Sequence, residues 1–208
     1  MYGCWIVIGD TLVDIDIDFG DRNQILQLIE HIPAVLENGN KHPSGVYVTT
    51  IPQNPITEFA SIDYKKAEEL GYFKIDFLNQ SVYKLVKSPT HLEQLLAKEP
   101  NWGLLHNRNI VEKLVHIGNY YDLIQKLPEP IDNVEKLACF LATIRPGKKH
   151  LQGLPWNIVE KTVWNREDTD GYTFRHSHAL SYSLLVCINL NLTEEQNDNN
   201  RKMGPPIS

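Results

Sequence analysis

The sequence predicts an α+β protein in which a small sheet comes first and an all-helical region follows. Three observations support this fold class. Polar and apolar residues alternate strictly near the N-terminus, two short apolar runs follow at residues 45–50 and 73–78, and apolar residues recur at helical spacing after residue 81. The 208 residues are 42% apolar and 22% charged, which suits one compact domain or two small ones.

The first 80 residues are predicted to form a small α/β unit. Residues 4–19 read as strand, because an apolar stretch leads into alternating Asp and apolar residues. A helix is expected over residues 20–36, where Ile25, Leu28, Ile29 and Ile32 have helical spacing and Pro33 ends the last turn. Strands at residues 45–50 and 73–78 flank a short helix at residues 63–70.

Residues 81–192 are predicted to be helical, because proline and glycine punctuate segments with helical apolar spacing. These segments are residues 92–98, 110–117, 120–127, 134–143, 158–164 and 177–189. Residues 193–208 are polar and lack periodicity, so a disordered tail is expected there.

Charge and composition narrow the choice of partners. The formal net charge is −6, and the sequence has no run of basic residues of the kind that binds nucleic-acid phosphates. Any contact with nucleic acid would therefore be local, metal-assisted or supplied by another chain. No apolar stretch approaches the roughly 18 residues of a membrane span, and the N-terminus lacks the basic start of a signal peptide. Three scattered cysteines suggest no disulfide framework, so the expectation is a soluble cytoplasmic protein without a membrane partner.

Asp14, Asp16 and Asp18 form the strongest local signal. Period-two spacing places the three carboxylates on one face of a strand, about 6 to 7 Å apart per step. Their repulsion is relieved by solvent, by protons or by divalent cations such as the paired Mg²⁺ ions of phosphoryl transfer. On spacing alone, a solvated strand face is the better interpretation.

Asp76 and Lys74 share one face of the apolar run at residues 73–78. They form either a structural ion pair or part of a metal and phosphate site. Other candidates are weaker: His150, His176 and His178 are expected to be surface histidines rather than metal ligands. The aromatic residues Trp5, Trp102, Trp156, Trp164, Tyr120 and Tyr121 are expected to be core rather than base-stacking platforms.

Five segments resemble, in order, motifs of the C-family bacterial replicative DNA polymerases, the family of the DNA polymerase III alpha subunit. Residues 14–19 (DIDIDF), 41–48 (KHPSGVYV) and 71–78 (GYFKIDFL) are similar to motifs of the palm. Residues 137–147 (LACFLATIRPG) and 170–182 (DGYTFRHSHALSY) are similar to motifs of the fingers. The resemblance implies a palm-like sheet of the nucleotidyltransferase type followed by a fingers-like helical region.

The resemblance also implies residue roles. Asp14, Asp16 and Asp76 match the catalytic aspartates, which hold two Mg²⁺ ions, or Mn²⁺, during nucleotidyl transfer. Four basic side chains match positions near phosphate or the incoming nucleotide: Lys74, Arg145, Arg175 and His178. Primed DNA and deoxynucleoside triphosphates would then be the substrates.

The sequence departs from that family in several places. Thirteen residues precede Asp14, without the Gly-Ser loop that cradles the triphosphate, and the stretch from Asp16 to Asp76 is too short for the thumb. A protein partner would have to supply both. Arg175 and His176 replace Asn and Lys, and Asn79 replaces Gly. Such a reduced palm and fingers suits a bacteriophage gene expressed in an infected bacterium.

Two functional classes are therefore expected. The first is a Mg²⁺-dependent DNA nucleotidyltransferase, which the three aspartates favour. The second is a non-catalytic binding or assembly protein that retains the polymerase-like fold. The missing loop, the missing thumb and the acidic balance favour this second class.

Overall fold

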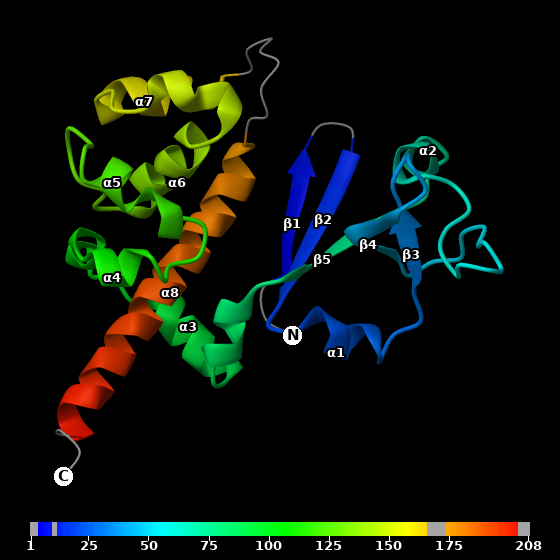
Figure 1. Ribbon diagram of the computed structural model, residues 1–208, viewed down its shortest axis with the longest axis horizontal. Helices are drawn as coiled ribbons and strands as arrows, with labels where there is room; N and C mark the ends of the chain where they lie inside the picture. Colours follow the sequence, from blue (N-terminus) through cyan, green and yellow to red (C-terminus); the bar gives the residue numbers. More distant parts are fainter. Residues whose placement is uncertain (1–3, 10–11, 166–173, 204–208) are drawn as a thin grey trace. The chain divides into compact units, whose positions relative to one another are not determined.

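The computed structural model describes the backbone of residues 4–9, 12–165 and 174–203, and the side chains of residues 15–165 and 174–199. The chain forms two compact units, Met1–Val86 and Lys87–Ser208. The first unit contains the sheet and the second is helical (Figure 1), which confirms the α+β class. The division falls six residues after the boundary expected at residue 80.

The first unit is built on a five-stranded sheet of order β1-β2-β5-β4-β3. Its strands are β1 (Cys4–Gly9), β2 (Leu12–Phe19), β3 (Ile32–Val35), β4 (Lys41–Tyr47) and β5 (Ile75–Asn79). The central pair β2 and β5 is parallel, and every other pair is antiparallel. The strand region expected at residues 4–19 is thus two strands, β1 and β2.

The helix predicted over residues 20–36 is wrong. Helix α1 covers only Arg22–Leu26, with the Asp21 side chain accepting from the backbone N–H of Asn23 at its start. Residues 32–35 form β3 at the edge of the sheet, where a proline is tolerated because no neighbour needs its missing N–H. Pro33 therefore favours an extended edge strand. The helical spacing of apolar residues that includes Leu28 does not form a buried helix face, because the Leu28 side chain is 80% exposed.

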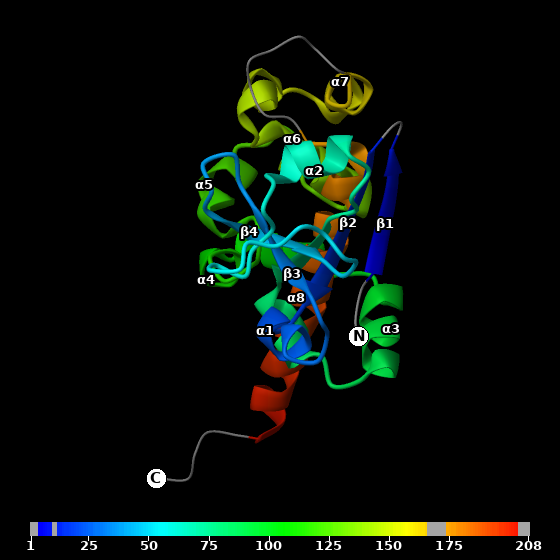
Figure 2. The same cartoon turned by 90° about the vertical axis from the view of Figure 1, so that its right-hand side faces the viewer.

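Helix α2 (Tyr64–Glu69) closes a small core against β3 and β4. Its N-cap Asp63 accepts from the backbone N–H groups of Lys65 and Lys66, and the expected helix at residues 63–70 is confirmed. The buried members of this core are Ala34, Tyr47, Ile51, Ala60 and Ala67. Helices α1 and α2 lie toward opposite ends of the sheet strands (Figure 2).

The second unit contains six α-helices among its described residues: α3 (Pro89–Ala97), α4 (Arg108–Val111), α5 (Tyr121–Ile124), α6 (Val134–Thr143), α7 (Trp156–Thr162) and α8 (His176–Met203). Short 3-10 turns join several elements: η1 (Ser81–Leu85) in the first unit, then η2 (Trp102–His106), η3 (Gly118–Tyr120) and η4 (Pro146–Leu151). Helices α4 and α5 are shorter than predicted. His116 has φ 63° between them, a left-handed conformation that a helix cannot contain.

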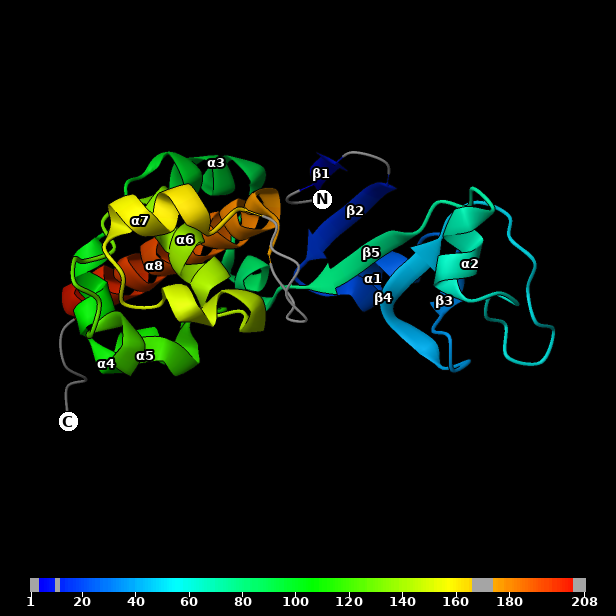
Figure 3. The same cartoon turned by 90° about the horizontal axis from the view of Figure 1, so that it is seen from above.

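The core of the second unit forms around α6, which packs against α8 (Figure 3). Residues 137–142 of α6 are all buried. Trp156 is buried in this core, and Trp102, Trp164, Tyr120 and Tyr121 pack against it, as predicted. The Trp5 side chain lies outside the described residues. Among the described residues, no helix is long and apolar enough to cross a membrane.

The structure differs from the expectation of a disordered tail after residue 192, because α8 continues to Met203. Ion pairs hold the polar turns of this helix in place. Glu194 pairs with Lys98 at 2.6 Å, and Glu195 approaches His91 Nε2 at 3.1 Å. The Lys98 hydrogen bond lowers the pKa of Glu194. These contacts connect residues about 100 positions apart, so local periodicity does not reveal them.

Asn191 of α8 provides a buried polar link to α3. Its Nδ2 group donates to the carbonyl oxygens of Leu95 and Lys98, both at 2.9 Å, and the residue has no exposed surface. These carbonyls belong to the C-terminal end of α3, where intrahelical donors run out. Asn191 therefore caps α3 from another helix.

We expect Asn191→Ala to destabilise the protein by about 2 kcal/mol, because it removes two hydrogen bonds from buried carbonyls. Urea denaturation measures this loss. Asn197→Ala is the matched control, since Asn197 is exposed on the same helix and the change has the same effect on helix propensity. Equal stability of the two variants would show that the Asn191 cap contributes nothing.

Candidate functional site

Two aspartates meet on the parallel strands at the centre of the first unit. Asp16 of β2 is the register partner of Asp76 of β5, and Ile15 and Ile17 are partners of Ile75 and Phe77. Residues paired this way in adjacent strands point to the same face of a sheet. Asp16 and Asp76 therefore share one face, while the Ile15 and Ile17 partners share the other.

Asp76 is buried, with 7% of its surface exposed, and both of its carboxylate oxygens have partners. The Ser44 hydroxyl donates to Oδ1 at 2.6 Å, and the Lys74 ammonium pairs with Oδ2. A buried carboxylate needs such compensation, because desolvation penalises an isolated charge by several kcal/mol. Strand β4 thus contributes Ser44 to the site, and β5 with its preceding residue contributes Asp76 and Lys74.

His42 lies beside Asp76 without donating to it. Its Nδ1 atom accepts backbone N–H groups from Gly45 at 2.8 Å and from Ser44 at 3.3 Å. An accepting Nδ1 carries no proton, so its approach to Asp76 Oδ1 at 3.6 Å is not a hydrogen-bonded ion pair. The His42 ring instead packs edge-on against Tyr64, with centroids 5.3 Å apart.

Gly45 is the register partner of Asp76 on the other side, and this position has no space for a side chain. A Cβ atom at Gly45 would lie 2.7 Å from Lys74 Cδ and 2.9 Å from His42 Nδ1. The glycine lets the stem of Lys74 cross strand β4 and bring its ammonium to Asp76. The glycine in the motif of residues 41–48 is therefore needed for the ion pair between Lys74 and Asp76.

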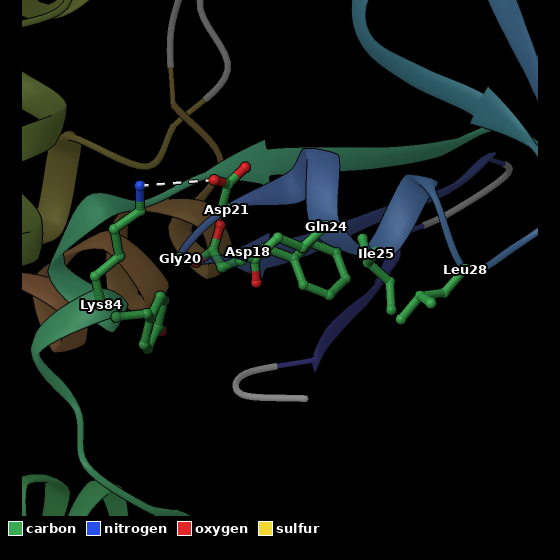
Figure 4. Close-up of a pocket in the computed structure, with 9 residues that line it drawn as sticks. Asp18, Gly20, Asp21, Gln24, Ile25, Leu28 and Lys84 are labelled. Carbon is green, nitrogen blue, oxygen red and sulfur yellow. Dashed lines mark ion pairs between the residues drawn. The ribbon is translucent and has the colours of Figure 1, made fainter.

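Asp18 lies two residues beyond Asp16 on β2 and lines a pocket of about 520 Å³. The pocket wall includes Ile25 and Leu28, together with the Asp21–Lys84 ion pair at 3.8 Å (Figure 4). Burial raises the pKa of Asp18 to about 6, with a further contribution from the charge of Asp16, and a Gln80 hydrogen bond opposes both. Negative charge is thus crowded along β2.

The structure brings together three of the predicted site residues: Asp16, Asp76 and Lys74. Asp14 is the register partner of Val7 in β2, but its side chain lies outside the described residues, so convergence of all three aspartates stays a prediction. The remaining predicted residues, Arg145, Arg175 and His178, belong to the second unit.

Arg145 packs against an aromatic ring of the second unit. Its guanidinium carbon lies 3.8 Å from the centroid of Phe174, a cation–π arrangement. Burial and the Arg145 charge lower the pKa of His116 to about 4, so that imidazole is neutral at physiological pH. Arg175 is exposed just before α8, and His178 is half-buried in its first turn.

Among the described residues, no group of three His, Cys, Asp or Glu side chains is arranged to hold a metal ion. His150 and His176 are exposed, as expected of surface histidines. His176 pairs with Glu135 at 3.3 Å and packs on Trp164.

The sequence indicates no role for Ser44, His42 or Asp18, although they lie in the motif of residues 41–48 and in the run of alternating aspartates. The signal for Ser44 and His42 was their place in a motif next to a glycine. Which of them contacts Asp76 depends on the pairing of β4 with β5, and a single sequence does not specify that pairing. Comparisons with protein-family models, with curated proteins and with solved structures found no match for this chain.

We expect Asp18→Asn to stabilise the protein near neutral pH. The folded-state pKa of about 6 lies above the 3.8 of an unperturbed aspartate, so the folded state binds the Asp18 proton more tightly. Stability therefore falls as pH rises from about 4 to 6 and stays lower above that range. Removing the charge recovers at most about 3 kcal/mol at pH 7.5, and nothing near pH 4.

Urea midpoints of the wild type and Asp18→Asn at both pH values test this expectation. Asp198→Asn is the control, because Asp198 is exposed on α8. A gain for Asp18→Asn that is the same at both pH values would show that the Asp18 charge is not penalised by folding.

Proposed function

We propose that this protein is a DNA nucleotidyltransferase of the C-polymerase type, in which Asp16 and Asp76 hold divalent cations. The observation that supports the proposal is the register match of these two residues on adjacent parallel strands. Two carboxylates on one sheet face, contributed by neighbouring strands, are the arrangement that two-metal phosphoryl transfer requires. Lys74 beside Asp76 adds a cation suited to phosphate.

The residues present fit a Mg²⁺ or Mn²⁺ ion. The donors are carboxylate oxygens, which both ions prefer. Burial and, second, the charge of Asp16 raise the pKa of Asp18, so Asp18 and Asp16 crowd negative charge on the same face. Asp16 and Asp76 would hold the cation, with Asp14 as the third ligand that the resemblance implies. A bound ion would activate the attacking hydroxyl and neutralise charge on the phosphate that is transferred.

The chain's own residues have separate roles in this proposal. Ser44 orients the Asp76 carboxylate by donating to Oδ1, and Gly45 leaves room for the stem of Lys74. Lys74 pairs with Asp76, and its ammonium would suit a phosphate oxygen of the substrate if a cation were bound at the carboxylates. Arg145, Arg175 and His178 are proposed nucleotide contacts from the helical unit.

Primed DNA and a deoxynucleoside triphosphate are the proposed substrates, and a protein partner is proposed to supply the triphosphate loop and the thumb. The net charge of −6 opposes an extended grip on duplex phosphates by this chain alone. The proposed setting is the cytoplasm of a bacterium, with a bacteriophage as the source of the gene.

The alternative is a non-catalytic binding or assembly protein with a polymerase-like fold. One observation favours it: Asp76 already has a partner for each carboxylate oxygen, in Ser44 and Lys74. An ion pair of this kind is sufficient to satisfy a buried carboxylate without any cation. The two functions differ in whether divalent cations bind at Asp16 and Asp76.

We expect Mn²⁺ or Mg²⁺ to stabilise the wild type, because a ligand that binds only the folded state raises the free energy of unfolding of the protein. At a concentration tenfold above the dissociation constant, the gain is about 1.4 kcal/mol, or about 4 °C in Tm for a chain of this size. Asp16→Asn and Asp76→Asn should abolish the shift.

Differential scanning fluorimetry with Mn²⁺ against EDTA measures the effect. Asp198→Asn serves as the control, because it removes an exposed carboxylate and should keep the full shift. If the wild type shows no shift, or if Asp16→Asn shows the same shift as the wild type, the aspartates form a solvated face and the alternative function is favoured.

We expect the isolated chain to extend primed DNA feebly or not at all, even with Mn²⁺. Each missing donor to a developing phosphate charge typically costs on the order of 3 kcal/mol in the transition state. Co-purifying proteins that supply the loop and thumb should restore extension. A primer-extension assay with and without those proteins measures this, with Asp14→Ala as the inactive control. Robust aspartate-dependent extension by the chain alone would contradict the expectation.

A further inference from the structure

A second pocket of the first unit is lined by basic and amide side chains, by Leu26 and Pro43, and by no acidic residue among the described residues. It has a volume of about 380 Å³, and its wall includes Arg22, Lys41, His42 and Asn79. It lies where α1 meets the start of β4 and the end of β5. The chain as a whole has a net charge of −6, so this pocket differs in sign from the chain average.

Arg22 is the distinctive residue of this pocket. It is charged, yet only 9% of its surface is exposed. Its Nη1 donates to the carbonyl oxygen of Pro43, and no carboxylate among the described residues lies within ion-pair distance of it. A guanidinium has five N–H donors, and a buried arginine is almost always paired with an anion. The described residues supply no such anion.

The neighbours of Arg22 leave side-chain donors available around the pocket. Asn79 Oδ1 accepts the backbone N–H of Arg22 at 2.7 Å, which fixes the side-chain amide and leaves Nδ2 as a further donor. Lys41 is exposed and lines the pocket, and its ammonium lies 5.7 Å from the centroid of the Phe59 ring. His42 connects the pocket with the aspartates, because its Nδ1 lies 3.6 Å from Asp76 Oδ1.

We propose that this pocket binds a phosphate group, with Arg22 as the buried ligand and Lys41 and Asn79 as its partners. A phosphate matches the guanidinium in charge and geometry and would supply the missing anion. The phosphate comes either from a free nucleotide or from a nucleic-acid backbone. This site uses none of the metal-binding aspartates, so it stands whether or not the chain catalyses nucleotidyl transfer.

The test is isothermal titration calorimetry of inorganic pyrophosphate in the presence of EDTA, which removes any binding through cations. We expect the wild type to bind and Lys41→Gln to bind roughly tenfold more weakly, because one charged hydrogen bond is lost. Arg22→Gln should bind more weakly still. Lys113→Gln removes an exposed lysine of the second unit and should bind like the wild type.

Additional variants and ligands separate the explanations. Arg22→Gln removes a buried group, so circular dichroism checks that this variant folds. If Arg22→Gln is unfolded, the result for the exposed Lys41→Gln variant decides the test. Asp16→Asn should retain pyrophosphate binding, which separates this site from the proposed metal site. A deoxynucleoside triphosphate and a short oligothymidylate, each competing with pyrophosphate, identify the source of the phosphate, and competition by either supports the proposal. Absence of pyrophosphate binding, or equal losses in Lys41→Gln and Lys113→Gln, would overturn it.

Discussion

The structure of the first unit depends on how the negative charge of the aspartates on one face of the sheet is compensated. Asp16 and Asp76 occupy the same register, and Asp18 follows one step along β2. Lys74 neutralises the charge of Asp76 and Ser44 donates a hydrogen bond to it, whereas burial and the charge of Asp16 raise the pKa of Asp18 to about 6. The neighbouring structure follows from this requirement, because Gly45 must be small for Lys74 to reach its partner. A divalent cation would relieve the remaining charge.

The two candidate sites of the first unit complement each other in charge. The carboxylates of β2 and β5 suit a cation, and the pocket with Arg22 and Lys41 suits an anion. His42 borders both, since it lines the basic pocket and approaches Asp76. Nucleotides carry phosphates together with bound cations, so adjacent sites of opposite preference are consistent with the proposed function. They are equally useful to a protein that binds nucleotides without transforming them.

The second unit is stabilised by contacts that are distant in sequence. Its core surrounds α6, and α8 runs along it as the longest helix of the described chain. Asn191 caps α3, and Glu194 and Glu195 pair with Lys98 and His91. These three residues fix α8 against α3 at the start of its polar segment. Polar residues here hold helices in place, in addition to the apolar core.

The sequence by itself determined the α+β class, the strand with alternating aspartates, the helix at Val134–Thr143 and the placement of Asp76 and Lys74 on one strand face, because each rests on local periodicity. It left open whether Asp76 and Lys74 form an ion pair, which the structure shows they do. Tertiary structure alone decided that residues 32–35 are an edge strand rather than a helix, and that the polar end of α8 is ordered. It also decided that Ser44 compensates Asp76 and that Arg22 is buried beside Lys41. The physical reason is the same in each case: strand order and long-range ion pairs join residues whose separation along the chain leaves no local pattern.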